Sequence, residues 1–141
     1  MTNRRLAFAK LACESAVALA EEYNFAISVV AVDSGGRTIA ALRTDHASYT
    51  SMEPARRKAI TSASLQFPTT VVAEIAASDP VAARALAAGD DLLAVPGGIP
   101  LLMDGMCVGG VGIAGGHHTD DQLVAEQVLA KLRQASEATN D

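Results

Sequence analysis

The densest group of side chains that could do chemistry lies near the carboxyl end of the chain, where residues 115–121 read Gly-Gly-His-His-Thr-Asp-Asp. Two imidazoles and two carboxylates within five residues could bind a divalent metal or haem iron, or act as general acids and bases. A plainer interpretation is a glycine-rich loop with exposed histidines, followed by acids that face a helix dipole. His117 and His118 are therefore candidate catalytic residues and candidate metal ligands, and both interpretations stay open.

A second group of charged residues combines Glu53 with the run Arg56-Arg57-Lys58. Glu53 and Arg57 lie four residues apart and could pair along a helix surface, and Glu53 is also a candidate general acid or base. Arg56 or Lys58 could instead bind the carboxylate of a ligand. His46 precedes this segment in a polar loop, where it is either plain surface, a haem axial ligand or a general base.

Periodicity and turn residues place these groups on a framework of helices and hairpins. Apolar spacing and capping residues predict helices over residues 4–23, 51–65, 69–77, 80–88 and 119–135. Apolar and β-branched runs predict strands over residues 25–33, 37–43, 92–95, 99–103 and 106–114. Strands joined by tight turns are antiparallel. We therefore expect an α+β fold, with a mostly antiparallel five-stranded sheet flanked by helices in a single domain over residues 1–141.

Local signals mark the ends of several of these elements. They are a capping box at Thr50 and Glu53, an N-cap and first helical residue at Asp79-Pro80, a C-terminal Gly89, a type I′ turn at Asp104-Gly105, and a capping pair at Thr119 and Gln122. These signals predict where the loops and turns lie that carry the candidate functional residues.

Residues 110–115 match the dinucleotide-binding pattern G-x-G-x-x-G. Only 26 residues, 116–141, follow the pattern, which is enough for a helix but not for a second parallel strand with a ribose-binding acid. We therefore predict that these glycines let the backbone approach a neighbouring element or a ligand closely.

Composition excludes several classes of function. The formal charge of −5, from 11 basic and 16 acidic residues, opposes binding to nucleic acid. No apolar run is long enough to span a membrane, and residues 1–10 lack the apolar core of a signal peptide, so a cytoplasmic location is expected. Cys13 and Cys107 lie in separate apolar segments and form no zinc motif.

Four segments form a recognisable series along the chain: residues 29–36, 55–63, 96–100 and 108–116, with Asp120 or Asp121 following. In this order they resemble the GlcG/HbpS-like family. The resemblance covers nearly the whole chain. It implies a profilin-like five-stranded antiparallel sheet with flanking helices, and assembly into homo-oligomers. It also implies varied functions, since some members bind or degrade haem and others are domains attached to cobalamin adenosyltransferases.

Three hypotheses follow. The first is a binding protein for haem or another tetrapyrrole, or for a carboxylated small molecule. Arg56 and Lys58 would neutralise carboxylates, and His46, His117 or His118 would ligate the iron. The backbone N–H groups that would line this site belong to Gly97, Gly98, Gly115 and Gly116. The second hypothesis is a cofactor-free isomerase, hydrolase or lyase for a small organic acid, with Glu53 or a histidine as acid or base. The third is a structural or regulatory oligomer.

Overall fold

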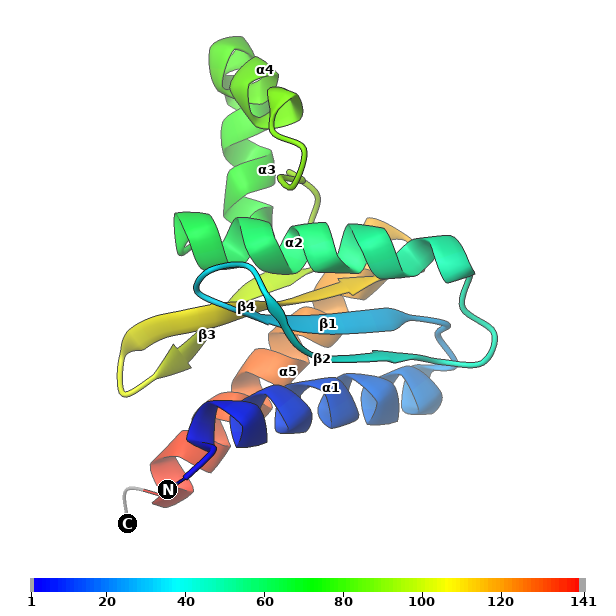
Figure 1. Ribbon diagram of the computed structural model, residues 1–141. Coiled ribbons are helices and arrows are strands. Elements are labelled where there is room, and N and C mark those ends of the chain that lie inside the picture. Colours follow the sequence, from blue (N-terminus) through cyan, green and yellow to red (C-terminus); the bar gives the residue numbers. More distant parts are fainter. Residues whose placement is uncertain (1, 140–141) are drawn as a thin grey trace.

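A four-stranded antiparallel sheet separates helix α2 from helices α1 and α5 in the computed structural model, which describes residues 2–139 (Figure 1). The strands lie in the order β2-β1-β4-β3. The helices are α1 (Arg4–Tyr23), α2 (Met52–Leu65), α3 (Thr69–Ser78), α4 (Pro80–Ala88) and α5 (His118–Thr139), with a 3₁₀ turn, η1, over Tyr49–Ser51. The strands are β1 (Ser28–Asp33), β2 (Thr38–Arg43), β3 (Gly98–Met103) and β4 (Met106–Ala114).

The prediction of an α+β fold with an antiparallel sheet is confirmed, but the prediction of a fifth strand over residues 92–95 is wrong. The backbone of this segment bonds to side chains of α2 instead of to a strand. The Leu92 carbonyl accepts a hydrogen bond from Arg57 Nη2 at 2.6 Å, and the Leu93 N–H donates to Thr61 Oγ1 at 2.8 Å. Both backbone groups are thereby satisfied away from the sheet, which removes the need for a neighbouring strand.

Helix α2 lies directly on the backbone of β4, because the strand has glycine where its side chains would face the helix. A Cβ atom added to Gly112 would lie 2.0 Å from the carbonyl oxygen of Ala55, and one added to Gly110 would lie 2.2 Å from that of Ala59. The helix matches this with a stripe of alanines that are fully or almost fully buried. The prediction that the 110–115 glycines permit close approach of the backbone is confirmed at these two positions.

The opposite face of the sheet carries the larger apolar core. Alternate residues of the strands point there, and α1 and α5 cover them. The buried members from the sheet are Val29, Ala31, Ile99, Leu101, Val111 and Ile113. In the β3–β4 turn, Asp104 and Gly105 both have positive φ, as the predicted type I′ turn requires.

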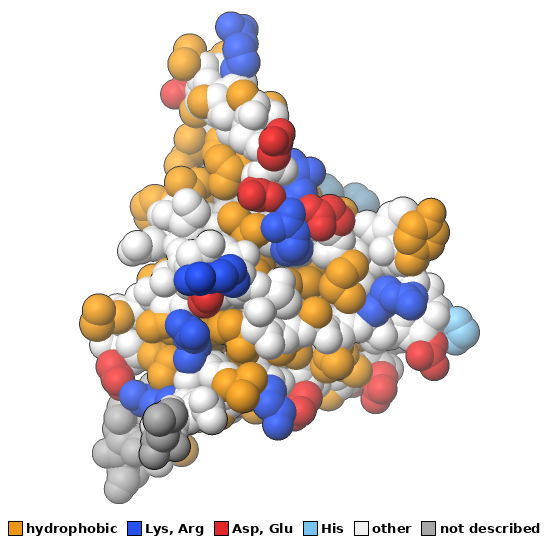
Figure 2. Space-filling view, in the orientation of Figure 1, with side chains coloured by type: hydrophobic (Ala, Val, Ile, Leu, Met, Phe, Trp, Pro, Cys, Tyr) orange, Lys and Arg blue, Asp and Glu red, His pale blue; other side chains and the backbone are white. Residues whose placement is uncertain are grey.

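Helices α3 and α4 form an arm that projects from the end of α2 (Figure 1). The Asp79 carboxylate caps α4, since it accepts hydrogen bonds from the N–H groups of Val81 and Ala82, and Pro80 is the first helical residue, as predicted. Gly89 follows the last helical residue, Ala88, in an extended conformation with φ of −83°. Figure 2 shows hydrophobic side chains along one edge of this arm. Within residues 2–139, no helix is long and apolar enough to cross a membrane.

Candidate functional site

A cavity of about 550 Å³ lies where the start of α2, the segment before β3 and the start of α5 meet. Its lining residues are Ser48, Thr50, Ser51, Pro54, Lys58, Leu93, Val95, Ala114, Gly115, Gly116, His117, His118 and Asp121. Five of the residues predicted from the sequence are among them: Lys58, Gly115, Gly116, His117 and His118. The cavity has the size of a small-molecule site and combines an apolar wall with hydroxyl, imidazole and charged groups.

Lys58 and Asp121 form a buried ion pair beside this cavity. The side chain of each is 3% exposed, and Lys58 Nζ lies 3.1 Å from Asp121 Oδ2. Nζ also donates to the carbonyl oxygen of Ile113 at 2.8 Å, and Asp121 Oδ1 accepts from the Gly116 N–H at 3.2 Å. Burial lowers the pKa of Lys58 and raises the pKa of Asp121, and the attraction between the two charges opposes both shifts.

The sequence predicted a solvent-facing or ligand-facing role for Lys58, and the structure places it in the interior. A signal for this was present, since Lys58 follows the buried Ala55 by three residues and precedes the buried Ser62 by four. Asp121 was named only as part of an acidic pair, and no pattern indicated that it, rather than Asp120, would face inward. Ser48, Thr50 and Ser51 were not predicted as residues of the site, because no local motif marks their hydroxyl groups as ligand-binding.

Gly97 and Gly98 do not line the cavity, and their N–H groups already have partners. The Gly97 N–H donates to Gln122 Oε1 at 3.0 Å, and the Gly98 N–H donates to Thr69 Oγ1 at 2.8 Å. Gly97 has φ of +127°, and a Cβ atom added there would lie 2.9 Å from Lys58 Nζ. Its role in the structure is to let the turn pass close to the buried ammonium. Gln122, expected to cap the last helix, holds this turn instead.

His117 and His118 begin α5 with different surroundings. The His117 carbonyl accepts the N–H groups of Asp120 and Asp121, and its Nδ1 accepts the Thr119 N–H at 3.3 Å, so His117 rather than Thr119 caps the helix. The His118 ring makes no hydrogen bond to any residue of the described range 2–139, and its centroid lies 4.2 Å from that of the His117 ring. Of the two imidazoles, that of His118 is the one whose ring nitrogens are both free for a ligand. Within residues 2–139, no group of three or more His, Cys, Asp and Glu side chains could hold a metal ion.

Glu53 and Arg56 pair with each other on the exposed side of α2, away from the cavity lining. Arg56 Nε donates to Glu53 Oε2 at 3.0 Å, and Arg56 Nη2 donates to Asp91 Oδ1 at 2.8 Å. The hydrogen bond from Arg56 lowers the pKa of Glu53, which makes the Glu53 carboxylate a weaker base. Glu53 pairs with Arg56 rather than with Arg57, and it forms no capping box with Thr50, because the Thr50 N–H donates to Ser48 Oγ at 3.3 Å.

His46 lines a different cavity, of about 660 Å³, at the end of α1 and the start of the loop after β2. Its other charged or aromatic lining residues are Glu21, Phe25, Arg43 and Asp45. His46 therefore does not join the other candidate residues. The sequence brought His46 and the two later histidines into one hypothetical site, and the fold separates them.

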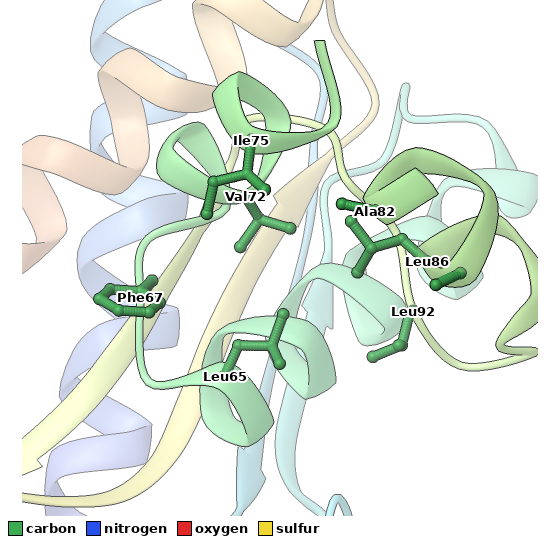
Figure 3. A pocket seen from close by; sticks show the side chains of 8 residues that line it. Leu65, Phe67, Val72, Ile75, Ala82, Leu86 and Leu92 are labelled. Carbon is green, nitrogen blue, oxygen red and sulfur yellow. The ribbon is translucent and has the colours of Figure 1, made fainter. Parts of the chain in front are cut away.

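The arm carries a third hollow, of about 350 Å³, which is almost entirely apolar. We call it the arm groove. Its lining residues are Leu65, Phe67, Val72, Ile75, Ala82, Ala85, Leu86 and Leu92, whose side chains Figure 3 shows around the opening. Phe67 is 50% exposed and Ile75 is 43% exposed, so large hydrophobic side chains remain in contact with water. With no ionisable group in its wall, this groove offers burial of apolar surface and no acid–base chemistry.

Comparison with known proteins identifies relatives over almost the whole chain. A family described as "Haem degrading protein HbpS-like" matches residues 5–130. An uncharacterised 15.0 kDa protein of the dhaT-dhaS intergenic region of Citrobacter freundii is 32% identical over 127 residues, which are 88% of each chain. A double mutant of Streptomyces reticuli HbpS is 34% identical, with a TM-score of 0.81 over 90% of this chain and 85% of that one. The complex of PduOC with haem is 25% identical, with a TM-score of 0.78 over 92% and 93%.

Proposed function

Since the chain belongs to the HbpS-like family, we propose that it binds haem or a related tetrapyrrole in the cavity at the start of α5, with His118 as the iron ligand. The single observation that carries the proposal is the His118 imidazole, which lines a cavity of about 550 Å³ and makes no hydrogen bond with the part of the chain that the structure describes. A neutral imidazole nitrogen is a common ligand of haem iron. The complex of PduOC with haem adds support, because that relative binds the same class of ligand.

The residues around the cavity fit a haem in two respects. Pro54, Leu93 and Val95 give an apolar wall against which a flat ring can pack, and the Ser48 and Thr50 hydroxyls lie at the polar part of the lining. Haem would supply an iron that binds or activates a small molecule, and the chain would supply the imidazole that holds the iron and the walls of the site. Arg56 is already paired with two carboxylates, so we assign the propionates to the hydroxyl groups rather than to Arg56.

The test is reconstitution of the purified chain with haem, followed by its visible spectrum. Wild type is expected to shift the Soret band, and His118→Ala is expected to lose the shift. His46→Ala is the matched control, because His46 is also an exposed imidazole but lines a different cavity. Absence of any Soret shift with haem in excess would overturn haem binding, and loss of the shift in His46→Ala alone would overturn the choice of site.

We further propose that the protein forms a homo-oligomer through the arm groove. Helix α4 has no buried residue, and the groove exposes Phe67 and Ile75 to water. Burying such surface against a second copy is favourable at roughly 25 cal/mol per Å². Light scattering on the purified chain tests this: a single monomeric species at micromolar concentration would contradict it.

A further inference from the structure

The buried pair of Lys58 and Asp121 plays no part in holding haem through His118, yet it lines the same cavity. A lysine ammonium has three N–H donors, and two of them are used by the Ile113 carbonyl and Asp121. Within residues 2–139 the third donor has no hydrogen-bond partner, although the side chain is only 3% exposed. Buried donors are nearly always paired, so a donor left over at a cavity wall indicates a ligand oxygen.

We propose that the Lys58–Asp121 pair is a proton-transfer centre that interconverts the keto and enol forms of a small carbonyl compound bound in this cavity. The activity goes beyond haem binding and does not depend on it. The substrate class follows from the groups present. The free N–H of Lys58 suits a carbonyl oxygen, the adjacent carboxylate suits a C–H proton next to that carbonyl, and the hydroxyls of Ser48 and Thr50 suit a second polar end of the substrate.

The reaction is balanced within the pair. The Asp121 carboxylate takes a proton from the carbon next to the carbonyl, and the C–H electrons form the C=C bond. The C=O π electrons move to oxygen, which receives a proton from the Lys58 ammonium. The products are the enol, a neutral amine and a neutral carboxylic acid. The acid then returns its proton to the amine across their 3.1 Å contact, which restores the starting state without any cofactor.

Two features of the surroundings support this assignment. Burial lowers the pKa of the lysine and raises that of the aspartate, which brings the two proton affinities closer and makes the return step easier. Gly97 lets the turn before β3 pack closely against Nζ, since a Cβ atom there would lie only 2.9 Å away. The candidate bases considered from the sequence are less suitable: Glu53 lies outside the cavity lining and pairs with Arg56, and His117 Nδ1 caps α5.

The experiment uses haem-free protein and two probes, phenylpyruvate and oxaloacetate. Enol formation is followed by ultraviolet absorbance, and deuterium incorporation at the carbon next to the carbonyl is followed by NMR in D₂O. We expect wild type to accelerate exchange of at least one probe by tenfold or more over buffer. Lys58→Met and Asp121→Asn are expected to lower the enzymatic rate by about 10²-fold or more, which is the usual contribution of a general acid or base.

Matched controls are Lys10→Met and Asp120→Asn, which remove a lysine and an aspartate that lie outside the cavity lining. Both are expected to keep the wild-type rate within twofold. Because a single substitution can unfold the chain, the double variant Lys58→Met/Asp121→Leu replaces the ion pair by apolar side chains. Its circular dichroism spectrum is expected to match wild type while its exchange rate falls to that of buffer.

The proposal is overturned if wild type accelerates neither probe, or if the folded double variant retains the wild-type rate. Neither result bears on the haem proposal, which is judged by the Soret band of His118→Ala. Conversely, if the protein accelerates exchange of a probe but haem never shifts its Soret band, the proton-transfer proposal stands and the haem proposal is overturned.

Discussion

The cavity at the start of α5 and the arm groove are opposite kinds of hollow in the same chain. The cavity is assembled from three separated segments, and its two charged side chains are buried against each other. The arm groove comes almost entirely from the continuous segment 65–92 and has no charged group in its wall. Charges held out of water require partners from distant parts of the chain, whereas an apolar surface needs only neighbouring helices. We therefore assign chemistry to the cavity and association to the groove.

The strongest test of this contrast is Lys58→Met, which should destabilise the fold by about 3–5 kcal/mol, since it leaves the Asp121 carboxylate buried without its partner. Urea unfolding followed by circular dichroism measures the change. The control Lys10→Met alters an exposed lysine and is expected to change the free energy of unfolding by less than about 0.5 kcal/mol. Lys58→Met/Asp121→Leu should recover most of the loss. If Lys58→Met is as stable as wild type, the Asp121 carboxylate does not depend on Lys58, and the contrast between the cavity and the arm groove fails.

The next largest effect is expected in the arm groove. Ile75→Asp puts a charge among apolar lining residues and should weaken self-association by roughly 2 kcal/mol, which is about a 30-fold increase in the dissociation constant. Analytical ultracentrifugation over a concentration series measures it. Val81→Asp is the matched control, because Val81 is 76% exposed on the same arm but does not line the groove. If both variants associate like wild type, the groove is not the interface.

A smaller effect is expected from Asp79→Ala, which removes the side chain that caps α4. Loss of an N-cap costs about 1 kcal/mol, and the effect should be confined to the arm. Hydrogen exchange is expected to show faster exchange in α4 and unchanged protection in β1 and β4. Asp90→Ala, in the exposed turn after α4, serves as the control. Faster exchange in the central strands would mean that the arm and the cavity are energetically one unit.

The smallest effect is expected in the pH dependence, because attraction between Lys58 and Asp121 offsets part of the effect of burial. Burial raises the pKa of Asp121 above its ordinary 3.8, so the folded chain holds its proton longer, and stability falls as pH rises from 3.8. Burial also lowers the pKa of Lys58 below its ordinary 10.5, so the unfolded chain binds more protons there, and stability rises as pH approaches 10.5. The free energy of unfolding of wild type, minus that of Lys58→Met/Asp121→Leu, should be lowest between these limits. A difference that is highest there would mean that attraction outweighs burial.

The sequence predicted the local elements better than the tertiary pairings. The bounds of α1, the cap at Asp79 and the turn at Asp104-Gly105 follow from residues a few positions apart, and all three are confirmed. The apolar pattern of segment 92–95 predicted a strand. Periodicity cannot reveal that Arg57 and Thr61 of α2 form the hydrogen bonds of its backbone groups.

The candidate site shows the same limit. The charged residues of α2 and the two histidines were found from their types, but only the fold shows which of them meet. Lys58 turns inward while Arg56, two residues earlier, stays at the surface with Glu53 and Asp91. Asp121 lies 63 residues beyond Lys58, and no spacing rule links positions so far apart.

The glycines of β4 determine how far α2, which carries Lys58, lies from the sheet. Because Gly110 and Gly112 let the main chain of α2 rest on the main chain of the strand, the height of the helix above the sheet is fixed by backbone thickness rather than by side-chain volume. Lys58 is carried at that height, opposite the end of the same strand, where Ile113 receives its hydrogen bond. Repacking the core on the far side of the sheet would then change the stability of the chain and leave the position of Lys58 unaltered, whereas a single methyl group at position 112 would push α2 away and move Lys58 Nζ with it.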